Sequence, residues 1–165
     1  MNKEEKATAY HEAGHALAAY RFGHYGGRIT IVPNGDRVGR SLSEAEWGDG
    51  STDIEQIIVL FAGLASESKY NADANKLGSS DDDEKAADLL ERTNETESSL
   101  RKKAKELIDK NWQIIEAIAE KLFIHKTLED DEWQIIIDAF DEGDDWEEKF
   151  DEMRAAIEEN RRRQL

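Results

Sequence analysis

Two histidines with a glutamate between them are the residues of this chain best suited to chemistry. His11 and His15 are four positions apart in the helix-favouring stretch Glu4–Ala19, and Glu12 follows the first of them. Side chains at i and i+4 lie one turn apart on the same helix face, so both imidazoles can bind one metal ion at about 2.0–2.1 Å. Glu12 lies about 100° round the helix from His11, toward the open side of such an ion. A carboxylate there can take the proton of a metal-bound water and pass it to a leaving amine, so the spacing predicts a zinc site that hydrolyses peptide bonds.

Chance is the alternative explanation of this spacing, with Glu12 as an ordinary solvated helix residue. In a chain with 4 histidines, chance would produce the pattern roughly once in a hundred sequences. Gly14 lies inside the same helical stretch, where glycine costs about 1 kcal/mol relative to alanine. Its presence predicts that another backbone packs closely against this turn.

A third protein ligand is needed, and the acidic run within Gly78–Ala86 is the best candidate to supply it. Ser79 or Ser80 can cap a helix there. The residues Asp81–Glu84 would then lie in its first turn, where the helix dipole favours negative charge. Capping and dipole compensation alone would explain at least two of the three aspartates. The run therefore predicts a helix start that also provides one ligand.

Four ordered segments resemble the peptidase domain of FtsH-type ATP-dependent zinc proteases. Thr8–Leu17 looks like the start of that domain, and Ile29–Gly39 is similar, without a gap, to the strand-turn-strand that follows its zinc helix. Ala62–Glu67 resembles the family's Gly-Gly-Arg-Ala-Ala-Glu helix, and Gly78–Ala86 resembles its Gly-x-x-Asn-Asp-x-x-x-Ala segment. Their order makes the resemblance specific, and we expect it to extend over roughly residues 5 to 140.

The resemblance implies a role for five residues around a Zn²⁺ cofactor. His11 and His15 correspond to zinc ligands and Glu12 to the catalytic carboxylate. Asp82 corresponds to the third ligand, because it stands four residues before an alanine as the family's ligand does. Glu67 corresponds to a carboxylate near the site, for which we predict a role in orienting a ligand imidazole.

Two positions depart from the family pattern. Leu64 stands where the family usually has arginine, and Ser68 where it has a second glutamate. Any ion pair between those two side chains is therefore absent from this chain. The surroundings of the predicted ligands differ to that extent from the family's.

The sequence predicts a zinc metalloendopeptidase that cleaves unfolded proteins or peptides. An extended substrate would add to an exposed strand at Val38–Ser43, along Val38, Gly39, Arg40 and Ser41. One alternative is a non-proteolytic regulatory or scaffold protein with an FtsH-like fold, against which the intact histidines, Glu12 and Asp82 argue. Another is a regulatory protease of the kind that cuts a repressor, which the match at Ile29–Gly39 disfavours.

The elements that must position these residues are mostly helices, so the predicted fold class is α+β and mainly α. A small hairpin or sheet is expected beside the zinc helix, because Pro33-Asn34-Gly35 is a turn signal between two alternating segments. The strands are predicted at Arg28–Val32 and Val38–Ser43. The helices are predicted at about Lys3–Phe22, Asp53–Lys69, Asp81–Arg92, Glu97–Phe123 and Glu129–Phe140, with one more from Trp146.

Length indicates a single domain, because 165 residues can bury a sizeable core. We predict the peptidase at residues 1–142 and an amphipathic helix at residues 143–165. The apolar stripe of that helix is predicted to pack on the same domain rather than on another subunit, and it consists of Trp146, Phe150, Met153 and Ile157. His24 and His125 are predicted to be surface residues, since three ligands and a water complete tetrahedral zinc.

Charge and composition restrict the partners. The net charge is −16, which disfavours nucleic acid and anionic membranes as partners. The predicted peptidase activity implies a polypeptide substrate. The chain has no cysteine, no signal segment, no glycine-rich phosphate loop and no apolar run of about 18 or more residues. We therefore expect a cytoplasmic peptidase without an ATPase module or membrane anchor. A homo-oligomer or a separate unfoldase is a possible partner.

Overall fold

A computed structural model describes residues 3–24, 27–33, 52–72 and 79–165 of the chain. It confirms a mainly helical α+β fold with one small antiparallel sheet. In chain order the elements are α1 (Lys3–Arg21), β1 (Ile29–Thr30), α2 (Asp53–Tyr70), α3 (Ser79–Leu90), α4 (Glu97–Lys110), α5 (Trp112–His125), β2 (Thr127–Leu128), α6 (Asp130–Glu142) and α7 (Trp146–Arg163).

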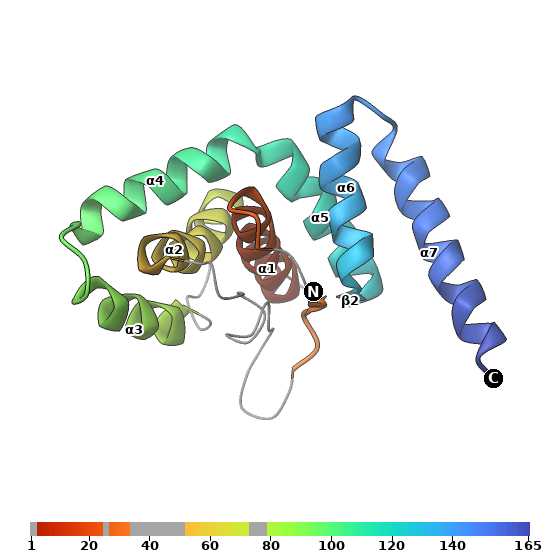
Figure 1. Cartoon of the computed structure of the whole chain (residues 1–165), viewed down its shortest axis with the longest axis horizontal. Coiled ribbons are helices and arrows are strands. Elements are labelled where there is room, and N and C mark those ends of the chain that lie inside the picture. Colours follow the sequence, from red (N-terminus) through yellow and green to blue (C-terminus); the bar gives the residue numbers. More distant parts are fainter. Residues whose placement is uncertain (1–2, 25–26, 34–51, 73–78) are drawn as a thin grey trace.

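Helix α1 lies at the centre of the molecule, with α2 on one side and α5 on the other (Figure 1). Small side chains let these helices approach closely, and Ala9, Ala13 and Ala16 are completely buried. A methyl group on Gly14 would lie 2.6 Å from the carbonyl oxygen of Ala62 in α2. The close backbone contact predicted from this helix-interior glycine is therefore confirmed.

Helix α2 begins with a capping box formed by Thr52 and Glu55. The Thr52 hydroxyl accepts a hydrogen bond from the Glu55 backbone N–H at 3.1 Å, and the Glu55 carboxylate accepts one from the Thr52 N–H at 3.3 Å. Each side chain thus satisfies a backbone donor at the open helix end. The capping stabilises the start of α2.

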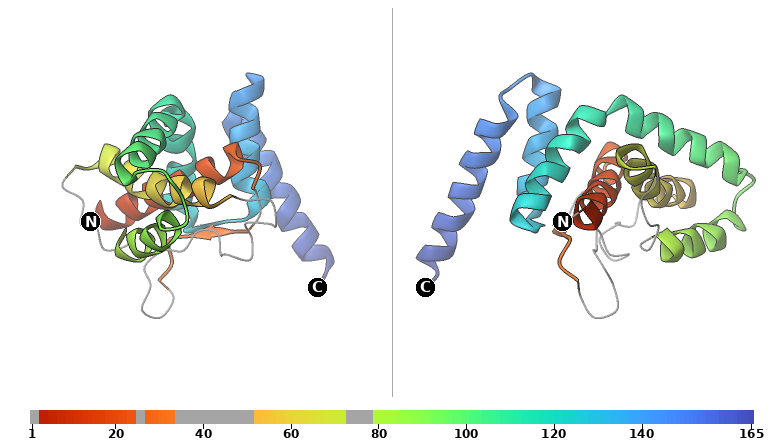
Figure 2. Two further views of the ribbon diagram at one scale, coloured as in Figure 1. Left: turned by 60° about the vertical axis from the view of Figure 1, so that its left-hand side comes forward. Right: turned by 180° about the vertical axis from the view of Figure 1, so that it is seen from behind.

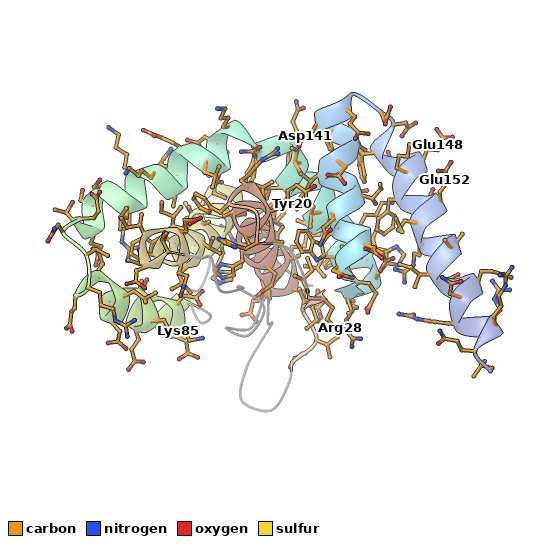
Figure 3. All side chains as sticks on the ribbon, in the orientation of Figure 1. Tyr20, Arg28, Lys85, Asp141, Glu148 and Glu152 are labelled. Carbon is orange, nitrogen blue, oxygen red and sulfur yellow. The ribbon has the colours of Figure 1, made fainter. Side chains whose placement is uncertain are left out.

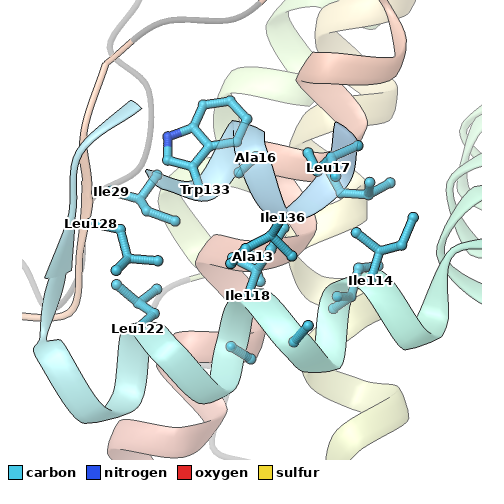
Figure 4. Packing of buried hydrophobic residues seen from close by; sticks show 14 of the residues in the cluster. Ala13, Ala16, Leu17, Ile29, Ile114, Ile118, Leu122, Leu128, Trp133 and Ile136 are labelled. Atoms are coloured by element: carbon cyan, nitrogen blue, oxygen red, sulfur yellow. The ribbon is translucent and has the colours of Figure 1, made fainter. Parts of the chain in front are cut away.

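The main core forms where α1, α5 and α6 meet the sheet (Figure 4). Leu17, Ile118, Leu122 and Ile136 are fully buried there, and the Trp133 indole N–H donates to the carbonyl of Gly27 at 3.0 Å. A second cluster on α2, α3 and α4 holds α3 in place. Its buried members are Ile57, Ile58, Phe61, Ala86, Leu100 and Ala104.

The sheet differs from the expected hairpin. Strand β1 pairs antiparallel with β2, Ile29 opposite Leu128 and Thr30 opposite Thr127. The expected second strand, Val38–Ser43, lies outside the described residues. Strand β2 was not predicted, because two residues are too short to show an alternating pattern and the pairing joins distant parts of the chain.

The prediction of a single helix over Glu97–Phe123 is wrong. The helix is interrupted at Asn111, between α4 and α5. The backbone of Asn111 has φ −115° and ψ 23°, and its side-chain amide donates to the Leu107 carbonyl at 2.8 Å. Asparagine competes in this way with helical hydrogen bonds. The Arg21 guanidinium also donates to the Asn111 side-chain oxygen at 2.9 Å. A contact with the end of α1 therefore stabilises this interruption between α4 and α5.

Helix α7 packs against α6 and forms one end of the molecule (Figures 1 and 2). Phe150 is completely buried, and the Arg154 guanidinium donates to the Glu132 carboxylate of α6 at 2.6 Å. Glu148 and Glu152 point away from α6 (Figure 3). The predicted domain division at residue 143 stays a prediction. None of the helices in the described residues combines the length and apolar character needed to cross a membrane.

Candidate metal centre

Three side chains from two helices bring their ligand atoms together. The Nε2 atoms of His11 and His15 are 3.0 Å apart, and the Oδ2 atom of Asp82 lies 2.9 Å from the first and 3.0 Å from the second. The histidines lie one turn apart on α1, and Asp82 lies in the first turn of α3. The structure thus brings together the three residues predicted to bind zinc, and within the described residues they form a group able to hold a metal ion.

Both imidazole rings are oriented by acceptors on α2. The Nδ1–H of His11 donates to Glu67 Oε1 at 2.9 Å, and the Nδ1–H of His15 donates to the Val59 carbonyl at 2.7 Å. The tautomers follow from these partners, since neither acceptor can donate a proton. When a metal ion is bound, each ring would therefore present the lone pair of its Nε2 atom to that ion beside Asp82. Glu67 lies where a residue that orients a ligand imidazole is expected.

Three acceptor atoms at such short separations fit a bound cation. Two imidazole lone pairs and a carboxylate oxygen repel one another unless a positive charge lies between them. Tetrahedral zinc with ligands at about 2.0–2.1 Å places its ligand atoms roughly 3.3–3.4 Å apart. The observed separations of 2.9–3.0 Å need to widen only slightly to match that geometry. Two nitrogen ligands and one oxygen ligand also suit zinc chemically.

The pKa shifts of His11 and Asp82 also favour a positive charge within the cluster. Burial opposes a charge on His11, but hydrogen bonds to Asp82 and Glu67 outweigh it and raise the pKa of His11 to about 10. Burial raises the pKa of the Asp82 carboxyl, but His15 and His11 outweigh it and hold that pKa well below its usual range. The cluster therefore holds a positive charge strongly, either as a proton or as a metal ion that displaces it.

Glu12 is buried beside this cluster, with 4% of its surface exposed. Its carboxylate lies near enough to His11 to raise the pKa of that ring. Glu12 is outside the group of three ligand atoms. This location agrees with a residue that acts next to a metal rather than binding it.

The remaining candidates from the sequence are the substrate strand and the two neighbours of Asp82. Val38, Gly39, Arg40 and Ser41, the predicted substrate strand, are outside the described residues. Asp81 is exposed and is not among the three residues of the cluster, whereas Asp83 accepts a hydrogen bond from Arg101 at 3.1 Å.

His24 and His125, predicted to be surface residues rather than parts of the site, are both partly covered by neighbouring helices. The side chain of His24 is only 11% exposed and its Nε2 lies 3.2 Å from Glu55 Oε2. The His125 ring stacks on Phe150 of α7, with the ring centroids 5.6 Å apart. Neither ring belongs to the cluster of ligand atoms described above.

A sequence model of peptidase family M41 matches residues 1–96, more than half of the chain. The chain belongs to peptidase family M41. All the residues of the candidate metal centre fall inside the matched range, including Asp82 near its end. The match stops before α4, so it is shorter than the extent over residues 5 to 140 expected from sequence.

Relatives of this M41 chain include ATP-dependent zinc metalloproteases FtsH from several bacteria. The one from Thermus thermophilus is 36% identical over 96 residues, which is 54% of this chain and 15% of the relative. The one from Metamycoplasma arthritidis is 34% identical over 97 residues, 54% of this chain and 13% of the relative. FtsH 1 from Rhodopirellula baltica is 33% identical over 98 residues, 56% of this chain and 14% of the relative. The chain thus matches about one seventh of the length of these relatives.

Sequence reasoning missed the part of the M41 centre that lies on α2 before Glu67. The Val59 carbonyl orients His15, and a backbone carbonyl carries no sequence signal. Gly63 packs directly against both imidazoles. The sequence does contain a signal for Gly63. A glycine inside a predicted helix indicates close packing, as it did for Gly14.

Proposed function

We propose that this chain is a zinc-dependent metallopeptidase that hydrolyses peptide bonds in unfolded proteins or peptides. The convergence of the His11, His15 and Asp82 ligand atoms to within 2.9–3.0 Å of one another, with Glu12 beside them, is the observation that carries the proposal. Membership of family M41 and the names of the relatives support it.

When bound, zinc would polarise the substrate carbonyl and lower the pKa of a bound water toward about 7. His11, His15 and Asp82 are the side chains that would hold it. These three side chains hold their ligand atoms close together. The hydrogen bonds from His11 to Glu67 and from His15 to Val59 prevent the rings from rotating. A fixed ligand set costs no reorganisation when charge develops during the reaction.

Glu12 is the residue proposed to move protons. Its carboxylate accepts a proton from the attacking water and later delivers that proton to the nitrogen of the leaving amine. Its burial at 4% exposure limits competition from bulk water for this carboxylate. A carboxylate is suited to both steps because it can accept and return the same proton.

The substrate and partners are also part of the proposal. An extended peptide would add along Val38–Ser43, with its hydrogen bonds made by backbone groups, so cleavage would depend little on side chains. The acidic net charge of −16 favours a polypeptide over nucleic acid. We propose a cytoplasmic location, with unfolded chains reaching the site directly or through a separate unfoldase.

The test compares wild-type protein with Glu12→Gln in two measurements, zinc content of the purified protein and cleavage of casein with and without a chelator. Wild type should carry one zinc per chain and lose cleavage when the chelator removes it. Glu12→Gln should keep the zinc and the fold but lose nearly all cleavage, because an amide cannot accept the proton of water.

Two outcomes would overturn the assignment. Loss of zinc from Glu12→Gln would make residue 12 a ligand rather than a base. Zinc binding by wild type without cleavage of casein or unfolded peptides would favour the scaffold alternative.

A further inference from the structure

Helix α2 presents three consecutive turns to the two histidines of α1. Val59, Gly63 and Glu67 are spaced by four residues, so they lie on one face of the helix. Val59 contacts His15 and Glu67 contacts His11, which shows that the two helices run antiparallel at this point. Gly63 lies between these two contacts, opposite the gap between the imidazole rings.

The space above Gly63 is occupied by the rings themselves. A methyl group on Gly63 would lie 2.5 Å from Nε2 of His15 and 2.9 Å from Nε2 of His11. It would also lie 2.4 Å from Cε1 of His15. All three distances are too short for contact between nonbonded atoms, whose attraction is optimal near about 3.5–4.0 Å. One or both rings would have to move away.

Neither ring can move without losing the hydrogen bond that orients it. His15 donates to the Val59 carbonyl at 2.7 Å and His11 donates to Glu67 at 2.9 Å. A shift of either ring would also separate the Nε2 atoms, which are 3.0 Å apart. An added methyl group would therefore act on the ligand geometry first.

Backbone conformation does not require glycine at this position. Gly63 lies in the interior of α2 and does not adopt the left-handed conformation seen at Gly23 and Gly143. Alanine is the better helix former at such a position. The reason for glycine is thus the space that its missing side chain leaves.

We propose that Gly63 is a positioning residue of the metal centre, and that its bare backbone sets how closely the two imidazole nitrogens approach each other. The inference rests on the proposed function for the identity of the ligands. It assigns to α2 a steric role in addition to its two hydrogen-bond acceptors. Any side chain at residue 63 would spread the histidines and weaken metal binding without opening the fold.

Gly14 supplies a matched control, because a methyl group there meets the backbone of α2 instead of the ligands. It would lie 2.6 Å from the Ala62 carbonyl oxygen and 2.6 Å from Ser66 Cβ. Gly14→Ala should therefore separate α1 from α2 and lower the melting temperature of the metal-free protein. Gly63→Ala should lower that melting temperature only while the two rings are present, since they must then leave their hydrogen bonds to Glu67 and Val59.

The first measurement is zinc affinity, obtained by competition with a chromophoric chelator. Gly63→Ala should bind zinc at least 10-fold more weakly than wild type, the lower end of the effect of losing an orienting contact. Substitution with Co²⁺ gives a second reading, because its visible absorption reports coordination geometry. The spectrum of Gly63→Ala should differ from that of wild type. Unchanged zinc affinity together with an unchanged cobalt spectrum would overturn the proposal.

The second measurement compares melting temperatures to test whether the new methyl group contacts the two imidazole rings. In a His11→Ala, His15→Ala background those rings are absent, so adding Gly63→Ala should not lower the melting temperature. Gly14→Ala should lower it in both backgrounds. If Gly63→Ala destabilised the metal-free protein equally with and without the histidines, Gly63 would be an ordinary packing residue and the proposal would be wrong.

Failure of the proposed function gives a different result. If wild-type protein bound neither zinc nor cobalt, the metallopeptidase proposal would fail at the first titration. The comparison of melting temperatures would still decide whether Gly63 makes room for the two rings, because it uses metal-free protein throughout.

Discussion

At the scale of single residues, the candidate metal centre is decided by atoms that sequence spacing identifies only in part. The pair His11 and His15 could be predicted because a helix repeats every 3.6 residues, so a separation of four brings two side chains together. Asp82 could not be derived from spacing alone, because it reaches the site from another helix and has acidic neighbours on both sides. Only the resemblance to a family distinguished it from Asp81 and Asp83.

Substituting the three aspartates one at a time tests that choice. Asp82→Asn should weaken zinc binding by at least the 10–100-fold known for the loss of a residue behind a ligand, because it removes a charge that contacts the metal. Asp81→Asn should alter only the dipole contribution, about 0.3–1 kcal/mol of stability. Asp83→Asn should in addition lose the hydrogen bond from Arg101 and still bind zinc. Zinc titration of the three variants measures this, and equal affinities would mean that the third ligand lies elsewhere.

At the scale of elements, most helices could be predicted and their connections could not. The apolar repeat that continues from α4 into α5 hides the break at Asn111, because both helices bury residues at the same period. Hydrogen bonds to Leu107 and Arg21 stabilise the break, and the second of these partners is distant in sequence. The pairing of β1 with β2 is likewise a tertiary contact with no local signal. Tertiary contacts of this kind override local propensity.

The attachment of α7 to α6 leads to a prediction at the same scale. Glu132 is 3% exposed in its side chain, caps the start of α6, and accepts the hydrogen bond from Arg154 at 2.6 Å. Arg154→Met would leave this buried carboxylate without its cation. We expect a loss of about 1–3 kcal/mol in the free energy of unfolding, measured by urea denaturation.

Arg161 offers the matched control for this substitution. It lies 3.8 Å from Glu129 with its side chain 64% exposed, so Arg161→Met should change stability by no more than about 0.5 kcal/mol. Equal losses for the two variants would mean that α7 contributes through its general charge rather than through the contact with Glu132.

At the scale of the whole molecule, the part of the chain beyond the family match completes the structure around the matched part. Helix α5 covers the face of α1 opposite α2, and β2 supplies the partner of β1. Helix α7 then packs on α6, with His125 and Phe150 in contact. Stability of the complete fold therefore responds to groups distant from the candidate metal centre.

We predict that His125 makes the stability of the fold depend on pH. Burial, together with the nearby Arg154, lowers the pKa of His125 below its ordinary value of 6.5. As the pH falls below about 6.5, the unfolded chain takes up a proton that the folded chain resists, so stability decreases toward acid. Above that pH the group makes no difference. Melting temperatures of wild type and His125→Gln at pH 5 and pH 7 should show a smaller acid loss in the variant, and equal losses would contradict the prediction.

The pairing of β1 with β2 has a consequence for the order of events during synthesis. Thr30 and its partner Thr127 are 97 residues apart in the chain. At about 5–20 residues per second, a ribosome takes roughly 5 to 20 seconds to synthesise the residues between them. During that interval α1 has emerged with its histidines, but α5 and β2 do not yet exist to cover its apolar face. The nascent chain therefore exposes the apolar face of α1 for seconds, at the stage when chaperone binding competes with aggregation.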